Sequence, residues 1–175
     1  KTKEISRSHK LIREKSGLIT IIGGKWTTYR KMAQDTLDLA IRYMHIPTKD
    51  CITERYQIHG SRKNPDFSDP LYVYGTDADE IRNLVASSPA MAEKLHPDYA
   101  YTVGEVTWLV RNEMPRTLED VLARRLRILF LDARAAMAMA PKVAGILATE
   151  WGKDETWTSA QVKAFNEVAS NYILN

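Results

Sequence analysis

Residues 18–30, Leu-Ile-Thr-Ile-Ile-Gly-Gly-Lys-Trp-Thr-Thr-Tyr-Arg, run from an apolar stretch through two glycines into a helical pattern. This order predicts a strand, a tight turn and a helix start, a common unit of α/β proteins. Glycines let the backbone approach a ligand closely, and a helix N-terminus favours negative charge. Lys25 adds a full positive charge at the same place. The stretch indicates a site for an anion or a polar ligand edge, although an ordinary strand–helix connection has the same pattern at Gly23–Gly24–Lys25 alone.

The residues around this turn predict a β-hairpin and one helix. Two strand-like runs, residues 5–12 and 18–22, flank the polar turn of residues 13–17. From residue 26 to about 44, apolar residues recur at spacings of three and four, and Pro47 follows. The stripe consists of Tyr29, Ala33, Thr36, Leu37, Ala40 and Met44. A hairpin with one helix is too small to bury a core alone, so we expect it to pack on something else.

Residues 46–70 are rich in turn formers and charge, which predicts a linker, and every strong pattern after Pro70 is helical. Asp77 and Glu80 have the spacing of a capping box, the reciprocal pair of side-chain bonds that opens a helix. The chain is therefore expected to be mainly α.

Further helices are expected along the chain, the first of them over residues 101–111, before Pro115. Thr117 with Asp120 predicts a cap for a helix through Phe130. Pro141 should kink or divide an Ala- and Met-rich helix over residues 132–149. A last helix is expected to open at residues 158–159.

The composition is that of an ordinary globular protein. The 175 residues are 44% apolar and 27% charged, and the net charge of +3 is too small to indicate nucleic acid. Arg124, Arg125 and Arg127 have acidic neighbours, which favours a solvated helix with ion pairs. No apolar run is long enough to span a bilayer. A single cysteine, Cys51, favours a reducing, cytoplasmic compartment. The four histidines have no metal-type spacing, so structural or surface roles are expected and no metal site.

Residues 19–33 resemble the last FAD-contacting segment of FAD-dependent glycerol-3-phosphate dehydrogenases. Residues 5–9 are similar to the segment of that family that carries a substrate-site arginine, and residues 117–125 with 129–132 are similar to its helical C-terminal domain. The resemblance covers essentially the full chain. It implies that residues 1–45 are the last piece of an FAD-binding α/β domain, that 46–70 are a linker, and that 71–175 are a helical C-terminal domain.

The resemblance also implies roles for particular residues. Arg7 and Lys25 match positions that bind glycerol 3-phosphate, and cations of these two kinds suit a phosphate. The expected flavin contacts, through backbone N–H groups and a hydroxyl, are Gly23, Gly24, Trp26, Thr27 and Thr28. In such an enzyme a hydride passes from the substrate to the flavin, dihydroxyacetone phosphate forms, and the electrons continue to a quinone. No catalytic residue is expected in this part.

The chain lacks parts that such an enzyme needs. None of its eight glycines forms a G-x-G-x-x-G motif, and no second strand–helix unit could hold the ADP half of FAD. The hydride-transfer arginine is expected upstream of Lys1, in an FAD-binding domain. We therefore expect a C-terminal fragment that neither binds FAD nor turns over substrate alone. A homodimer and a peripheral contact with the inner face of the cell membrane are left open.

Two alternatives stay open. The lone cysteine argues against the iron–sulfur-associated relative of the dehydrogenases, whose C-terminal region is rich in cysteine, but an oxygen-using glycerophosphate oxidase fits the same motifs. The other alternative, from a different class, is a non-catalytic helical domain that binds a partner protein, because residues 70–175 carry no chemical motif of their own.

Overall fold

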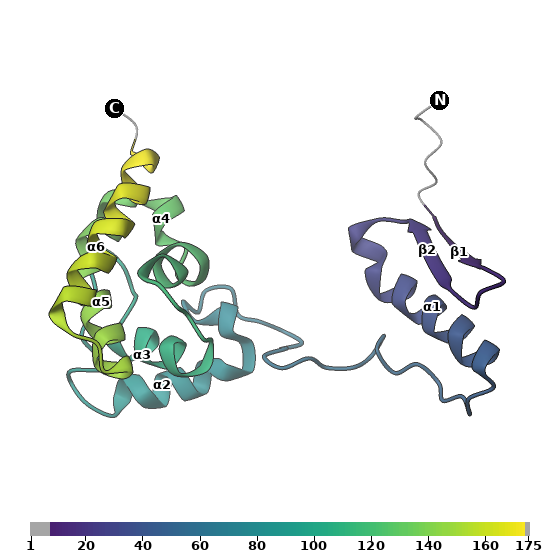
Figure 1. Ribbon diagram of the computed structural model, residues 1–175. Coiled ribbons are helices and arrows are strands. Elements are labelled where there is room, and N and C mark those ends of the chain that lie inside the picture. The colour runs from purple at the N-terminus through teal and green to yellow at the C-terminus, as the bar shows by residue number, and fades with distance from the viewer. Residues whose placement is uncertain (1–7, 174–175) are drawn as a thin grey trace. The chain divides into compact units, whose positions relative to one another are not determined.

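The chain divides into two compact units between Ile58 and His59 in a computed structural model that describes residues 8–173 (Figure 1). The first unit contains β1 (His9–Arg13), β2 (Ile19–Gly23), the 3-10 turn η2 (Trp26–Thr28) and α1 (Tyr29–Met44). The second unit contains η3 (Tyr72–Asp77), α2 (Ala78–Ala86), α3 (Val103–Asn112), the π-helical η4 (Asp120–Arg125), α4 (Ile128–Leu131), α5 (Ala133–Trp151), α6 (Glu155–Ala169) and η5 (Ser170–Tyr172). The expectation of a mainly helical chain with an N-terminal hairpin is confirmed.

The hairpin pairs β1 with β2 in antiparallel register, with Leu11 opposite Ile21. Its turn is closed by the amide of Glu14, which donates to the carbonyl of Leu18 at 2.9 Å. Gly17 supplies the positive φ, +91°, that such a tight turn requires. The predicted hairpin is confirmed from His9 onward, and the part of its first strand before residue 8 lies outside the described residues.

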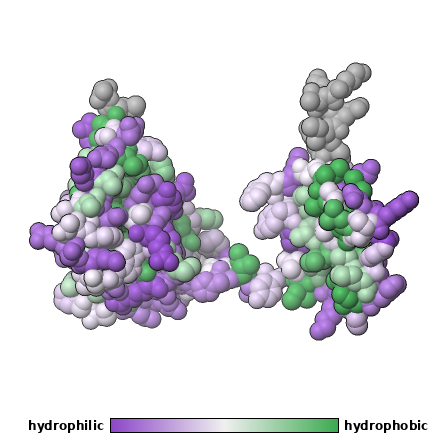
Figure 2. Space-filling view, viewed as in Figure 1, coloured by the Kyte–Doolittle hydropathy of each residue, from purple (hydrophilic) through white to green (hydrophobic). Residues whose placement is uncertain are grey.

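The helix of the first unit shows a difference from the sequence pattern. The α1 side chains that are half-buried are those of Met32, Asp35, Thr36 and Leu39, together with a few neighbours. The predicted apolar stripe is largely exposed, since Tyr29 is 65%, Leu37 60% and Met44 58% accessible. The helix itself is confirmed, but its apolar stripe is not covered within the described chain. Apolar residues, green in Figure 2, form a band over part of the visible face of this unit.

The second unit has a core of its own. Its longest helix is α5, and most of the buried side chains on this helix are small. Helix α6 lies beside it (Figure 1). Small side chains let helices approach closely, which suits this alanine-rich sequence. The largest fully buried side chains are Phe165, Ile81, Leu109, Leu118, Leu122, Ile128, Leu129, Met139, Leu147, Val106, Val121 and Val143.

Two side-chain contacts differ from the expected helical pattern, and one of the two outcomes expected at Pro141, division of the helix, does not occur. Asp77 is the N-cap of α2 but makes no side-chain cap bond, because its carboxylate contacts His59 Nε2 at 2.8 Å. Glu80, the other half of the expected capping box, accepts a bond from the Trp108 indole at 3.1 Å instead. Pro141 lies inside α5, which continues undivided to Trp151.

The remaining boundaries are shifted or broken. The helix expected from Thr117 through Phe130 is interrupted at Arg127, which adopts a left-handed backbone with φ +59° between η4 and α4. The last helix begins earlier than expected, at Glu155, because the Asp154 carboxylate accepts from the amide of Trp157 and caps it.

Candidate functional site

The strand–helix turn of the first unit is built on two glycines with positive φ, +80° at Gly23 and +81° at Gly24. Side-chain-bearing residues rarely adopt this backbone. A Cβ on Gly24 would also lie 2.5 Å from Met32 Sδ, so the first turn of α1 packs directly over the glycine. The backbone conformation therefore calls for glycine at this turn, and a Cβ on Gly24 would also have to displace the end of the Met32 side chain.

A single hydroxyl fixes the residues that follow. Thr28 Oγ1 donates to the carbonyl oxygen of Lys25 at 2.9 Å and accepts from the Lys25 amide at 3.3 Å. These bonds hold Lys25 in an extended conformation at the head of η2. The hydroxyl hydrogen of Thr28 is thereby used within the turn, whereas no bond of the Thr27 hydroxyl is recorded among the described residues.

The turn presents donors rather than acceptors. The first helical hydrogen bond runs from the amide of Thr28 to the carbonyl of Lys25, so the amides of Trp26 and Thr27 precede it and have no acceptor in the helix. No ion pair of Lys25 is recorded within residues 8–173. Two open amides and an exposed ammonium make this turn suitable for an anion.

A second cluster of charge lies beside the turn. His9 pairs with Gly23 in the hairpin, and its Nε2 lies 2.9 Å from Asp35 Oδ2, while Lys31 Nζ lies 2.9 Å from Asp35 Oδ1. The hydrogen bond from Lys31, and a weaker one from His9, hold the pKa of the Asp35 carboxyl below its usual value. The carboxylate thus neutralises Lys31, whereas Lys25 has no carboxylate partner within residues 8–173.

The histidine spacing in the sequence predicts a structural or surface role for His9 but gives no sign of its carboxylate partner. The two residues are 26 positions apart. Only the prediction that the hairpin and the helix pack together could have suggested the contact between them.

Arg7, the other expected substrate ligand, lies outside the described residues. Its pairing with Lys25 around one phosphate therefore stays a prediction. Gly23, Gly24, Lys25, Trp26, Thr27 and Thr28 do lie together in one turn. Trp26 is 88% exposed, and its ring lies 6.0 Å from that of Tyr29.

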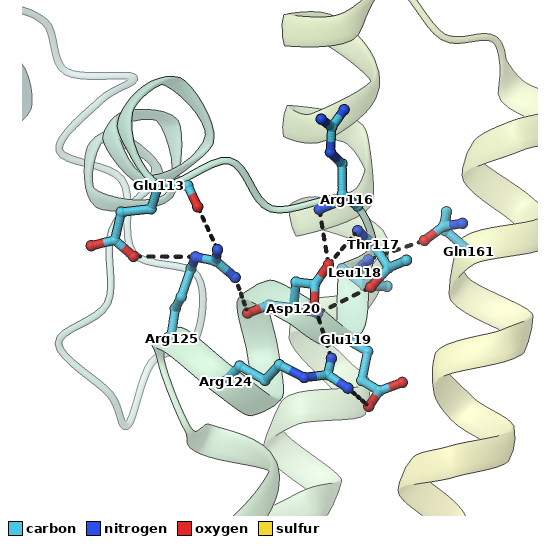
Figure 3. A network of polar contacts seen from close by, with 9 residues as sticks. All are labelled: Glu113, Arg116, Thr117, Leu118, Glu119, Asp120, Arg124, Arg125 and Gln161. Atoms are coloured by element: carbon cyan, nitrogen blue, oxygen red, sulfur yellow. Dashed lines mark hydrogen bonds and ion pairs between the residues drawn. The ribbon is translucent and has the colours of Figure 1, made fainter. Parts of the chain in front are cut away.

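The arginine-rich segment of the second unit is occupied by its own acids (Figure 3). Arg124 contacts Glu119 at 2.7 Å and Asp120 at 2.9 Å, and Arg125 contacts the Glu113 carboxylate at 3.1 Å. These guanidinium groups have partners within the fold, as the sequence reading expected. A nucleic-acid surface gains no support from them.

Asp120 also confirms the predicted cap. Its carboxylate accepts from the amides of Arg116 and Thr117, and its own amide donates to Thr117 Oγ1 at 3.2 Å. The amide of Leu118 donates to Gln161 at 3.0 Å and ties this segment to α6 (Figure 3). These polar residues therefore have a structural role in this network, and the network gives no reason to assign them a catalytic or binding role.

Within residues 8–173, no three side chains of the metal-binding types come together to hold an ion. None of the helices described there is both long enough and apolar enough to cross a membrane.

Comparison with known proteins identifies similar chains. The family model for the C-terminal domain of alpha-glycerophosphate oxidase matches residues 18–158. A probable mitochondrial glycerol-3-phosphate dehydrogenase of Caenorhabditis elegans is 34% identical, in an alignment that covers 98% of this chain and 26% of the relative. The mitochondrial glycerol-3-phosphate dehydrogenase SDP6 of Arabidopsis thaliana is 31% identical, over 97% of this chain and 34% of its own length. The chain thus spans between a quarter and about a third of these relatives.

Proposed function

The chain belongs to the family of the C-terminal domain of alpha-glycerophosphate oxidase, and from this we propose that it is the C-terminal part of an FAD-dependent glycerol-3-phosphate dehydrogenase. The whole enzyme would oxidise glycerol 3-phosphate to dihydroxyacetone phosphate and pass the electrons to a quinone at a membrane surface. The names of the relatives and the small share of their length that this chain spans support this proposal.

The turn from Gly23 to Thr28 is the observation that carries the proposal. It combines two amides without helical acceptors, an exposed ammonium and a glycine that leaves no room for a side chain. A phosphate and a reduced flavin ring are both anionic, so one donor-rich turn suits both. The residues present therefore fit the cofactor that the family implies.

FAD, when bound, would supply the hydride acceptor for oxidation of the substrate carbinol carbon. The residues of this chain would bind and orient the substrate and the flavin. Lys25, together with Arg7, would hold the substrate phosphate, and the amides of Trp26 and Thr27 would face negative charge on the flavin edge. The Thr27 hydroxyl, which makes no bond to any of residues 8–173, suits a flavin contact better than the Thr28 hydroxyl, whose hydrogen is donated to the Lys25 carbonyl.

The first unit also supports a role as one piece of a larger domain. None of its described side chains is buried, and its exposed apolar stripe on α1 needs a covering surface. We assign residues 1–45 to the cofactor domain and 71–175 to a separate helical domain, with the rest of the longer protein covering that stripe. The upstream FAD-binding domain would then supply the rest of the cofactor site and the hydride-transfer residue.

The test is Lys25→Ala in the full-length enzyme. Loss of a charged contact with phosphate costs about 1.5–3 kcal/mol, so the KM for glycerol 3-phosphate should rise by roughly tenfold or more. Lys15→Ala, in the hairpin turn of the same unit, is the matched control and should leave the kinetics unchanged. An unchanged KM and kcat/KM in Lys25→Ala would overturn the assignment of this turn to the substrate pocket.

The matching family model favours a second candidate, an oxidase that passes electrons to oxygen. Full-length protein separates the two candidates. Quinone reduction without peroxide supports the dehydrogenase, and peroxide released in proportion to substrate supports the oxidase.

A further inference from the structure

The second unit contains a cavity of about 610 Å³ that the proposed redox chemistry does not use. It lies between α2 and the segment that leads into α3, and Leu71, Ile81, Val85 and Ala86 form an apolar side. This volume is within the range of small-molecule sites, which are mostly apolar with a few polar groups. The cavity therefore has the size and the lining of a ligand site.

Two tyrosines make a fixed aromatic wall. The rings of Tyr99 and Tyr101 are stacked, with centroids 6.1 Å apart and planes 16° apart. Tyr99 donates to the Asp132 carboxylate at 3.0 Å, and Tyr101 donates to the carbonyl of Leu126 at 3.0 Å. Because both hydroxyls are bound elsewhere, the wall offers ring surface and no free donor.

Two of the residues that line the cavity are acidic, Glu105 and Asp69. Glu105 lines the cavity and is only 5% exposed. Its carboxylate accepts a hydrogen bond from the Tyr74 hydroxyl at 2.7 Å. A carboxylate offers about four lone-pair sites, so Glu105 has capacity for another donor. Within residues 8–173 the Glu105 carboxylate has no ion pair, and burial raises the pKa of this carboxyl because it disfavours the charged form.

The one cation among the lining residues is already paired. Arg82 contacts Asp69, a second lining carboxylate, and also Asp79. Two carboxylates therefore line the cavity against one guanidinium that has partners of its own. This imbalance selects against anions and in favour of a ligand that brings a positive charge to Glu105.

We propose that this cavity binds a small organic amine, with its apolar body against the tyrosine wall and Val85 and its ammonium group donating to Glu105. The site belongs to the helical unit and does not depend on the proposed oxidation of glycerol 3-phosphate.

Three isosteric probes test the proposal on the 175-residue chain by calorimetric titration and amide chemical shifts. They are 2-naphthylmethylamine, 2-naphthylmethanol and 2-naphthoate, which share one ring system and differ in charge. The amine should bind at least about tenfold more tightly than the alcohol, the value of one charged hydrogen bond, and the carboxylate should bind least. Shift changes should centre on Thr102, Glu105 and Val85.

Two substitutions locate the site. Ala86→Phe places a ring in the cavity from an exposed position on its wall and should weaken amine binding by about tenfold or more. Ala160→Phe, at an exposed position on α6, is the matched control and should bind as the unsubstituted chain does. Glu105→Gln, checked for folding by circular dichroism, should abolish the preference for amine over alcohol.

The proposal is overturned if the three probes bind equally or if none binds up to its solubility limit. It is also overturned if Ala86→Phe binds the amine as tightly as Ala160→Phe does. Failure of these tests would leave the kinetic test of Lys25 untouched, because the two sites lie in different units.

Discussion

The two units of the chain differ in what holds them together. In the first, residues 8–58 include no buried side chain, although the hairpin and α1 are regular. In the second, twelve large side chains are fully buried among the helices. Both units therefore contain regular secondary structure, but among the described residues only the second unit supplies its own core.

This difference bears on the proposed function, because the turn from Gly23 to Thr28 belongs to the unit without a core. A binding site needs its groups held by a packed surrounding. The exposed stripe on α1, with Tyr29, Leu37 and Met44, is the surface on which that packing would form. The proposed site is thus complete only in a longer protein, whereas the cavity at Glu105 is surrounded by its own unit.

The largest expected effect comes from truncating one leucine in each unit. Leu109 is fully buried in α3 and Leu37 is 60% exposed on α1. Leu109→Ala should lower the free energy of unfolding by about 2–5 kcal/mol, through lost burial and a cavity. Leu37→Ala should change it by less than about 0.5 kcal/mol. Urea unfolding followed by circular dichroism measures both.

Similar losses for the two variants would contradict the contrast between the units. They would mean that the α1 stripe is covered within this chain. If instead Leu37→Ala became strongly destabilising only in the full-length protein, the stripe would be identified as the contact with the remainder of the enzyme.

The sequence predicts those features of the structure that depend on interactions between residues close together in the chain. The hairpin turn at Gly17 and the reciprocal cap of Thr117 with Asp120 depend on residues a few positions apart, and both were predictable. The expected cap at Asp77 and Glu80 has the same spacing but fails. Each of those carboxylates finds a partner elsewhere, in His59 and in Trp108 respectively.

The candidate site divides in the same way. The turn and its open cation could be predicted, because glycines and a following helix start are visible in the sequence. The pairing of His9 with Asp35 and the cavity at Glu105 could not, since they join residues brought together only by packing. A further limit was the half-buried side of α1, which includes the polar Asp35 and Thr36, whereas much of the predicted apolar stripe is exposed.

The next largest effect concerns the glycines of the first unit, which separate backbone strain from packing. Gly24→Ala would meet both a φ of +81° and the Met32 sulfur, whereas a Cβ on Gly17 meets nothing within 4 Å. We expect amides of α1 to exchange about tenfold faster in Gly24→Ala, a loss of about 1.4 kcal/mol. Gly17→Ala should have a smaller effect, confined to the hairpin amides. Equal effects on α1 in the two variants would show that packing of Met32 over the turn contributes nothing.

The smallest expected effect is electrostatic and lies in the second unit. Glu150 on α5 accepts two bonds from Arg111 on α3, both at 2.8 Å, and these hold the pKa of the Glu150 carboxyl below its usual value. Because the folded-state pKa is the lower one, the stabilisation is complete above the unfolded pKa and is lost as the pH falls through the folded pKa. Arg111 is half exposed, so solvent screening limits the pair to about 0.5 kcal/mol.

A double-mutant cycle of Glu150→Gln with Arg111→Gln measures that coupling at pH 7 and again in acid. The coupling should be present at pH 7 and absent once the carboxyl is protonated. In the first unit, Lys31 and Asp35 form a pair within a single helix, which cannot tie one element to another. The Arg111–Glu150 pair joins two helices that already share a core, so it reinforces packing rather than replacing it. A coupling that persisted in acid would show that shape, not charge, holds these two side chains together.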